Sequence, residues 1–176
     1  MVLVLEERLK IEADRNIMRD DATHERFEFV QKGSNEKTIG PEVVDFTQAI
    51  LRDYTVYARR YAWHGHTITT LMMVAEAVAN AMLWGNQRTP GKKIKAEVEY
   101  GLLGSAIFIQ DDGRGFDYAA AIEKLRHGER YYLRQGSGLK RFDETPLHIA
   151  YHDHGTLISI ATPPISMKEA TAWIHK

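Results

Sequence analysis

Apolar residues recur at intervals of three and four in two long segments of the chain, which predicts two amphipathic helices. The first is expected to open at Pro41, because proline fits the first turn of a helix, and to run to about Tyr57. The sequence WHGHT interrupts the pattern, and the second helix then runs from about Thr67 to Trp84. We expect one apolar stripe of the second helix to face a core: Leu71, Val74, Ala75, Val78 and Met82.

Short apolar runs bounded by glycine predict strands around these helices. The run RFEFVQKG alternates between apolar and polar residues and is expected at a sheet edge. IKAEVEY and SAIFIQD form one predicted hairpin through Gly101 and Gly104, and LHIAYHD and TLISIAT form a second through HGT. Because the strands come in antiparallel pairs with helices between them, we expect an α+β fold, a two-layer α/β sandwich. Its sheet is expected to be mixed but mostly antiparallel, with the helices on one face.

The two ends of the chain are predicted to be helical. Residues 1–21 carry apolar residues among charges at only loosely regular intervals, which is typical of a peripheral arm or of a contact with another chain. We therefore divide the chain into a helical arm at residues 1–26 and a single domain at residues 27–176, and a homodimer through the arm is left open. A last short helix is expected in SMKEATAWIHK.

Composition narrows the function classes. The 176 residues carry a formal net charge of −1, which gives no basic field for nucleic acid. The chain has no cysteine, which excludes disulfides, thiolate metal sites and cysteine nucleophiles and fits a reducing compartment. The apolar start is too short for the core of a signal peptide, and no apolar run approaches the ~18 residues of a membrane span. We expect a soluble cytoplasmic protein that binds neither nucleic acid nor membrane.

Two candidate ligand sites are set aside on chemical grounds. GNQRTPGKKI resembles a phosphate-binding P-loop, but five residues separate its glycines where the motif has four, and lysine follows Lys92 in place of serine or threonine. We interpret it as a surface loop. No obvious third metal ligand lies beside the two histidine pairs, which are His152 and His154 of HDH and His64 and His66. Polar turns are therefore favoured over metal sites.

Two glycine-containing turns are better candidates. DDGRGFD follows the apolar run AIFI, so Asp111 stands at a strand end with Gly113 and Gly115 behind it, a pattern that suits close approach of the backbone to a ligand. An ordinary turn rich in Asp and Gly is the alternative. GSGL, residues 136–139, opens a helix. Its uncovered N–H groups and the helix dipole suit a phosphate, although a flexible loop has the same composition.

The second predicted helix carries an acid and an amide, Glu76 and Asn80, four residues apart. This step puts both side chains on one helix face, one turn apart. Asparagine is a mediocre helix former, but its amide oxygen can ligate a hard cation. A solvated helix edge with an incidental hydrogen bond is the alternative explanation.

Taken in order, these segments resemble the GHKL superfamily of ATPases and kinases, which have the Bergerat nucleotide-binding fold. The family order is an N-box on a helix, a D-x-G-x-G box after a strand, a lid, a G-x-G-L box and a final G-T before a strand. The corresponding segments here are EAVANAMLWGN, DDGRG, residues 116–135, GSGL and Gly155–Thr156, all within residues 27–162. One departure is Trp84, which stands where the family usually has histidine.

The resemblance implies a role for each matching position. Asn80 would hold Mg²⁺, Asp111 would accept a hydrogen bond from the adenine amino group, and Glu76 would be the general base of phosphoryl transfer. Thr156 would support Asp111 and the adenine edge. The remaining implied ATP-contacting positions lie in the glycine-containing turns: Gly113, Gly115, Phe116, Gly136, Ser137, Gly138 and Leu139. Basic residues in and beside the lid are candidates for neutralising phosphate charge: Arg126, Arg130, Arg134 and Lys140.

Within the superfamily, the chain is most similar to the anti-sigma-factor serine/threonine protein kinases, because E-x-x-x-N-A opens the N-box and the lid is short. This similarity implies phosphorylation of a small anti-anti-sigma-type (STAS-like) protein and sequestration of a sigma factor. Two alternatives are left open. One is a non-catalytic ATP-dependent binding module, and the other is a detached ATP-binding domain of a sensor histidine kinase.

Overall fold

The computed structural model describes residues 23–60, 66–101, 104–127 and 137–162 of the chain. The helices expected at residues 1–21 and in the C-terminal tail lie outside these ranges, as do residues 128–135 of the predicted lid.

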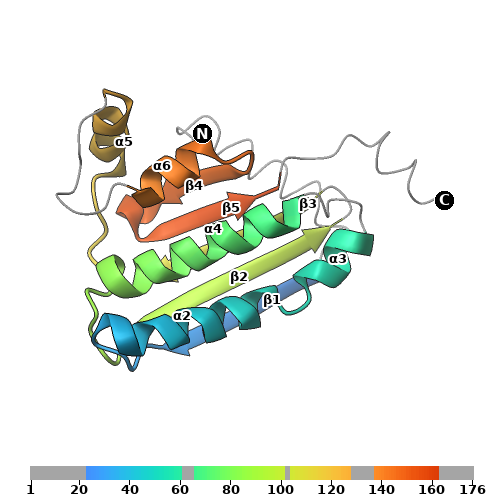
Figure 1. The fold of residues 1–176 in the computed structure, drawn as a ribbon, viewed down its shortest axis with the longest axis horizontal. Coiled ribbons are helices and arrows are strands. Elements are labelled where there is room, and N and C mark those ends of the chain that lie inside the picture. The colour runs from blue at the N-terminus through green and yellow to red at the C-terminus, as the bar shows by residue number, and fades with distance from the viewer. Residues whose placement is uncertain (1–22, 61–65, 102–103, 128–136, 163–176) are drawn as a thin grey trace.

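Five strands form one sheet with the order β1-β2-β3-β5-β4 (Figure 1). All four pairings between them are antiparallel, which confirms the α+β class and both predicted hairpins. The sheet was expected to be mixed, but the described strands contain no parallel pair. The edge strand begins at Thr23, within the range assigned to the arm. The strands are β1 (Thr23–Val30), β2 (Lys93–Gly101), β3 (Gly104–Asp111), β4 (His148–His152) and β5 (Leu157–Ala161).

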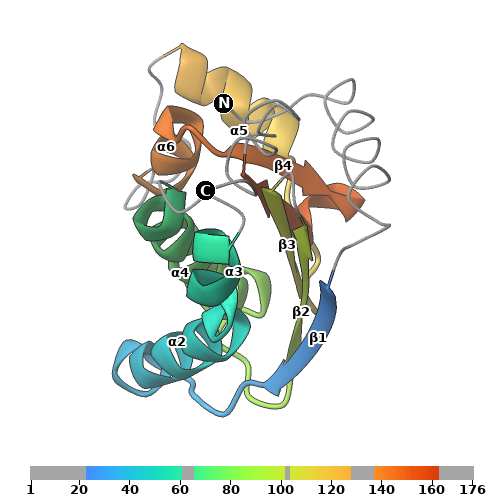
Figure 2. The same ribbon diagram turned by 90° about the vertical axis from the view of Figure 1, so that its right-hand side faces the viewer.

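The helices cover one face of the sheet, which gives two layers (Figure 2). This arrangement agrees with the predicted two-layer α/β sandwich. Helices α2, α3, α4 and α6 lie on that face, and α5 lies beside α6 at one end of the molecule. The helices are α2 (Glu36–Leu51), α3 (Tyr54–Arg60), α4 (Thr67–Asn80), α5 (Tyr118–Arg126) and α6 (Ser137–Glu144), and a π-helical turn, η2 (Ala81–Gly85), continues α4.

The start of α2 differs from the prediction. Asn35 is its N-cap, and the Asn35 side chain accepts hydrogen bonds from the N–H groups of Lys37 and Thr38 at 3.1 and 3.2 Å. The Thr38 hydroxyl accepts in return from the Asn35 N–H at 3.3 Å, which completes a capping box. The helix therefore begins at Glu36, and Pro41 lies inside it. The predicted opening at Pro41 is wrong because the capping box satisfies the first N–H groups more than a turn earlier.

The buried stripe of α4 is rotated relative to the prediction. Val74, Val78 and Met82 are buried as expected, but Leu71 is 48% exposed and Ala75 is only partly buried. The Tyr54 hydroxyl donates a hydrogen bond to the Thr70 hydroxyl at 2.8 Å in the core, so Thr70 marks the inward face where Leu71 was expected. The other buried α4 residues follow Thr70 at helical spacing: Met73, Ala77 and, in η2, Ala81.

The continuous helix Thr67–Gly85 has 19 residues and a mean hydropathy of 1.3, so by length and composition alone it is apolar enough to cross a membrane. It is not one uninterrupted apolar run, because threonines, Glu76 and Asn80 interrupt it. The observation is weak evidence for a membrane span, because the core helix of a soluble protein has the same composition. In this structure, its inner face packs against the sheet in the main core cluster.

Candidate functional site

Glu76, Asn80 and Gly138 lie together where α4 faces the start of α6. The acid and the amide are one turn apart on α4, and both are partly buried. A Cβ atom placed on Gly138 would lie 2.7 Å from Glu76 Oε1 and 3.2 Å from Asn80 Nδ2. The glycine is therefore needed for space, because any side chain there would displace the acid or the amide. The structure thus brings together three residues that the resemblance assigned to the base, the metal ligand and the phosphate loop.

Glu76 is also held by a residue that the sequence analysis missed. Arg141 Nη1 donates a hydrogen bond to Glu76 Oε2 at 2.9 Å. The Arg141 side chain is 57% exposed, whereas that of Glu76 is 21% exposed. The only signal in the sequence is spacing, since Arg141 follows Gly138 by three residues and so shares its face of α6.

Asp111 lies at the end of β3, packed between two glycines. The Gly113 N–H donates to Asp111 Oδ1 at 2.7 Å. A Cβ atom on Gly85 would overlap the Asp111 carboxylate, and a Cβ atom on Gly113 would overlap the Gly85 carbonyl. The end of the η2 turn and the turn after β3 are therefore in direct backbone contact, and the carboxylate is held between them.

Burial raises the pKa of the Asp111 carboxyl to about 6, while the Gly113 N–H and the nearby Lys92 act in the opposite direction. Desolvation disfavours the charged form of the carboxyl more than the one hydrogen bond and the one lysine favour it. A carboxyl group with this pKa is mostly ionised at neutral pH and can accept a hydrogen bond from a ligand donor.

The contact between Gly85 and Asp111 depends on the π-helical turn η2. The Asn86 N–H donates to the Ala81 carbonyl at 2.7 Å, a five-residue step that widens the end of the helix. Such turns are rare and occur often at functional sites.

Trp84 lies in this turn and is 50% exposed, with the Arg88 guanidinium 5.8 Å from its ring centroid. Trp84 is therefore not a core residue.

A buried amide pair supports the turn after Asp111, and sequence reasoning did not find it. Asn86 Oδ1 accepts from the Asp112 N–H at 3.0 Å, and Asn86 Nδ2 donates to Gln31 Oε1 and to the Lys93 carbonyl, both at 3.3 Å. Gln31 and Asn86 are 1% and 0% exposed. Asn86 lies in the loop that resembles a P-loop and that the sequence analysis interpreted as a surface loop. Its position directly after Gly85 is the only signal in the sequence that could have indicated its role.

The turn between β4 and β5 closes the other side of Asp111. The Asp111 N–H donates to the Thr156 carbonyl at 3.0 Å, and the Phe116 N–H donates to the His154 carbonyl at 2.8 Å. The Thr156 hydroxyl donates to the Asp153 carbonyl at 2.9 Å, so the hydrogen bond between Thr156 and Asp111 is made by the backbone of Thr156. Gly115 has a φ of +70° and packs against the His154 carbonyl, where a Cβ atom would overlap.

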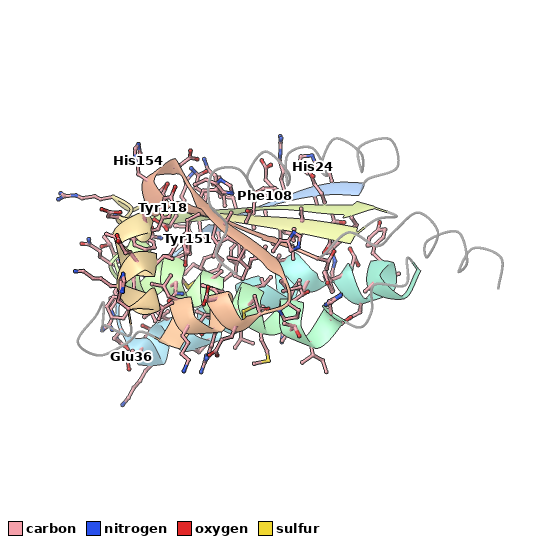
Figure 3. The ribbon with its side chains drawn as sticks, turned by 90° about the horizontal axis from the view of Figure 1, so that it is seen from above. His24, Glu36, Phe108, Tyr118, Tyr151 and His154 are labelled. Atoms are coloured by element: carbon pink, nitrogen blue, oxygen red, sulfur yellow. The ribbon has the colours of Figure 1, made fainter. Side chains whose placement is uncertain are left out.

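A groove of about 450 Å³ opens beside this turn, lined by Arg114, Gly115, Phe116, Asp117, Tyr118 and His154, with Ala119. Figure 3 shows Tyr118, Tyr151 and His154 at the same end of the sheet. The Tyr118 and Tyr151 rings stack with centroids 5.9 Å apart, and Phe116 meets Tyr151 edge-on at 5.2 Å. The groove shares Gly115 and Phe116 with the predicted site but does not include Glu76, Asn80 or Asp111.

The remaining predicted positions are only partly described. Gly136, Arg130 and Arg134 lie outside the described residues, Ser137 begins α6, and Leu139 is partly buried on it. Lys140 is exposed and pairs with Glu144 at 3.7 Å. The described ranges contain no cluster of three or more His, Asp or Glu side chains able to hold a metal ion.

No family model and no curated protein matches the sequence.

Proposed function

We propose that this chain is a MgATP-binding serine/threonine protein kinase with the Bergerat fold, of the anti-sigma-factor type. Its substrate would be a small anti-anti-sigma-type (STAS-like) protein, with a sigma factor as a second partner. The observation that carries the proposal is the convergence of Glu76 and Asn80 on Gly138 at the start of α6. An acid can take the proton, an amide oxygen can ligate the magnesium ion and a helix start without side chains can meet phosphate, so this set of groups supports phosphoryl transfer.

The residues present fit the nucleotide and the ion. Gly138 leaves the start of α6 without a side chain where phosphates would meet backbone N–H groups. Asn80 offers one side-chain oxygen, which is sufficient because Mg²⁺ keeps several waters and takes further ligands from phosphates. Asp111 would accept the adenine amino hydrogen and would disfavour guanine, which has an oxygen at that position.

The chemistry assigned to the chain is general-base catalysis. Bound MgATP would supply the phosphoryl group and a positive charge near the transferred phosphate. Glu76 would take the proton of the substrate hydroxyl as the serine or threonine oxygen forms its bond to phosphorus. The products are phosphorylated protein and ADP, with the proton left on Glu76.

One observation favours a second candidate function. Glu76 Oε2 accepts a hydrogen bond from Arg141, so the acid is engaged by a cation in this structure. An acid that stays so engaged would not act as a base, and the chain would then be a nucleotide-dependent binding module that exchanges partners without transferring phosphate.

Phosphate transfer decides between these functions. Purified chain, radiolabelled ATP, Mg²⁺ and candidate STAS-like proteins should give an acid-stable phosphoprotein, and Glu76→Gln should abolish the label while ATP binding persists. An acid-labile product would indicate phosphohistidine and a sensor-kinase origin. ATP binding with no transfer to any candidate would favour the binding module. Absence of ATP binding would overturn both.

A further inference from the structure

Arg141 connects α6 to the one charged residue of the N-box helix. Within Thr67–Gly85, Glu76 is the only charged side chain, and its Oε2 accepts the 2.9 Å bond from Arg141 Nη1. Its other oxygen, Oε1, faces Gly138. Gly138, the Glu76 carboxylate and the Arg141 guanidinium therefore form a continuous row, and the arginine lies one helical turn from the start of α6.

The backbone of α6 is fixed, whereas the Arg141 side chain is not enclosed. Phe142, the next residue, is fully buried, and its ring lies 6.4 Å from that of Tyr151. Arg141 itself is 57% exposed. The neighbouring cation, Lys140, points to Glu144 instead. The guanidinium can therefore change partners by side-chain rotation without movement of the helix.

The ion pair is weak compared with the contact that would replace it. An exposed arginine paired with a carboxylate gains little, because solvent screens the charges and the long side chain loses freedom. A guanidinium makes stronger, often bidentate, bonds to a phosphate, which carries more charge and matches its geometry. A doubly charged terminal phosphate near Gly138 would compete successfully for Arg141.

We propose that Arg141 is a specificity-determining residue that distinguishes a nucleoside triphosphate from a diphosphate by leaving Glu76 for the terminal phosphate. This inference rests on the proposed nucleotide site. It has a second consequence, because departure of Arg141 releases Glu76 Oε2. The acid becomes available as a base only when a third phosphate is present, so the ion pair holds Glu76 inactive with ADP.

The test is calorimetric titration of the full chain with ATP and with ADP, each with Mg²⁺. Arg141→Ala should weaken ATP binding about tenfold and change ADP binding less than about twofold. Arg141→Lys should lose less ATP affinity than the alanine variant. Arg52→Ala removes the same exposed guanidinium at the end of α2, where Arg52 pairs with Asp53 at 3.2 Å, and is the matched control, for which both affinities should stay unchanged. Thermal unfolding of each variant checks that it is folded.

A double-mutant cycle tests the exchange itself. Glu76→Gln releases Arg141 and should tighten ATP binding about twofold to fivefold with ADP unchanged. The gain should disappear in the double variant Glu76→Gln/Arg141→Ala. Equal effects of Arg141→Ala on ATP and ADP, or none, would overturn the inference and leave nucleotide binding intact. Failure of the wild-type chain to bind either nucleotide would overturn the proposed function as well.

Discussion

Gly85 and Asp111 pack so closely that a Cβ atom at position 85 would overlap the Asp111 carboxylate. Gly85 is the last residue of the π-helical turn, and Asp111 is the last residue of β3, so this contact joins the helical layer to the sheet at the predicted adenine end of the site. The position of the carboxylate depends on the absence of a single methyl group.

Gly85→Ala is therefore expected to destabilise the fold and to displace Asp111. Overpacking at a closed contact costs about 1–3 kcal/mol, and we expect a loss in this range in denaturant unfolding, together with weaker ATP binding. Gly40→Ala is the matched control, because Gly40 lies inside α2 with nothing within 4 Å of its added Cβ atom. It should stabilise the protein by about 0.5–1 kcal/mol. Unchanged stability in Gly85→Ala would contradict the packing described here.

Because the pKa of the Asp111 carboxyl is raised in the fold, we predict that the free energy of unfolding falls as the pH rises. Its pKa is about 6 in the fold against 3.8 in an unfolded chain, so the folded state binds the proton more tightly between these values. The free energy of unfolding should then decrease as the pH rises from about 4 to about 6, by on the order of 2 kcal/mol, and stay level above.

Asp111→Asn removes this titrating group, and we expect it to raise the stability of the fold and to lower the affinity for ATP. The variant should lack that decrease and be about 2 kcal/mol more stable than the wild type at pH 7, because no charge is buried. Its ATP affinity should fall sharply, since an amide presents a donor as well as an acceptor to adenine. Denaturant unfolding across pH and calorimetry with ATP measure the two effects. A variant that keeps both the pH dependence and the ATP affinity would show that Asp111 is not the titrating acceptor.

Asn86 is predicted to be a structural residue of the site. Asn86→Ala would leave the partly buried Asp112 N–H and the buried Gln31 side-chain oxygen without these partners. Each buried group left unsatisfied costs about 1–3 kcal/mol, so a loss of about 2–4 kcal/mol is expected in denaturant unfolding. Gln110→Ala, which removes an exposed amide on β3, should change stability by less than about 0.5 kcal/mol. Similar values for the two variants would refute the role assigned to the amide pair.

What the sequence could predict follows from the range of each interaction. Glu76 and Asn80 were paired because the helical repeat alone puts them on one face. The hairpin through HGT was predicted because a short turn with glycine separates two apolar runs, and the structure shows positive φ values there at His154 and Gly155. The pairing of Asn86 with Gln31 could not be predicted, because 55 residues separate them and no periodicity links them. The same holds for Arg141 and Glu76, which are 65 residues apart.

Asn80 provides the test of the metal site. Asn80→Ala removes the only side-chain oxygen that the proposal assigns to Mg²⁺, so binding of ATP with Mg²⁺ should weaken by about tenfold or more, while binding of ADP without metal should change little. Ala is a better helix former than Asn and position 80 is partly exposed, so the fold should not be weakened. Calorimetry with and without Mg²⁺ separates the two effects. Equal losses for both ligands would mean that Asn80 contacts the nucleotide or shapes the pocket and holds no metal.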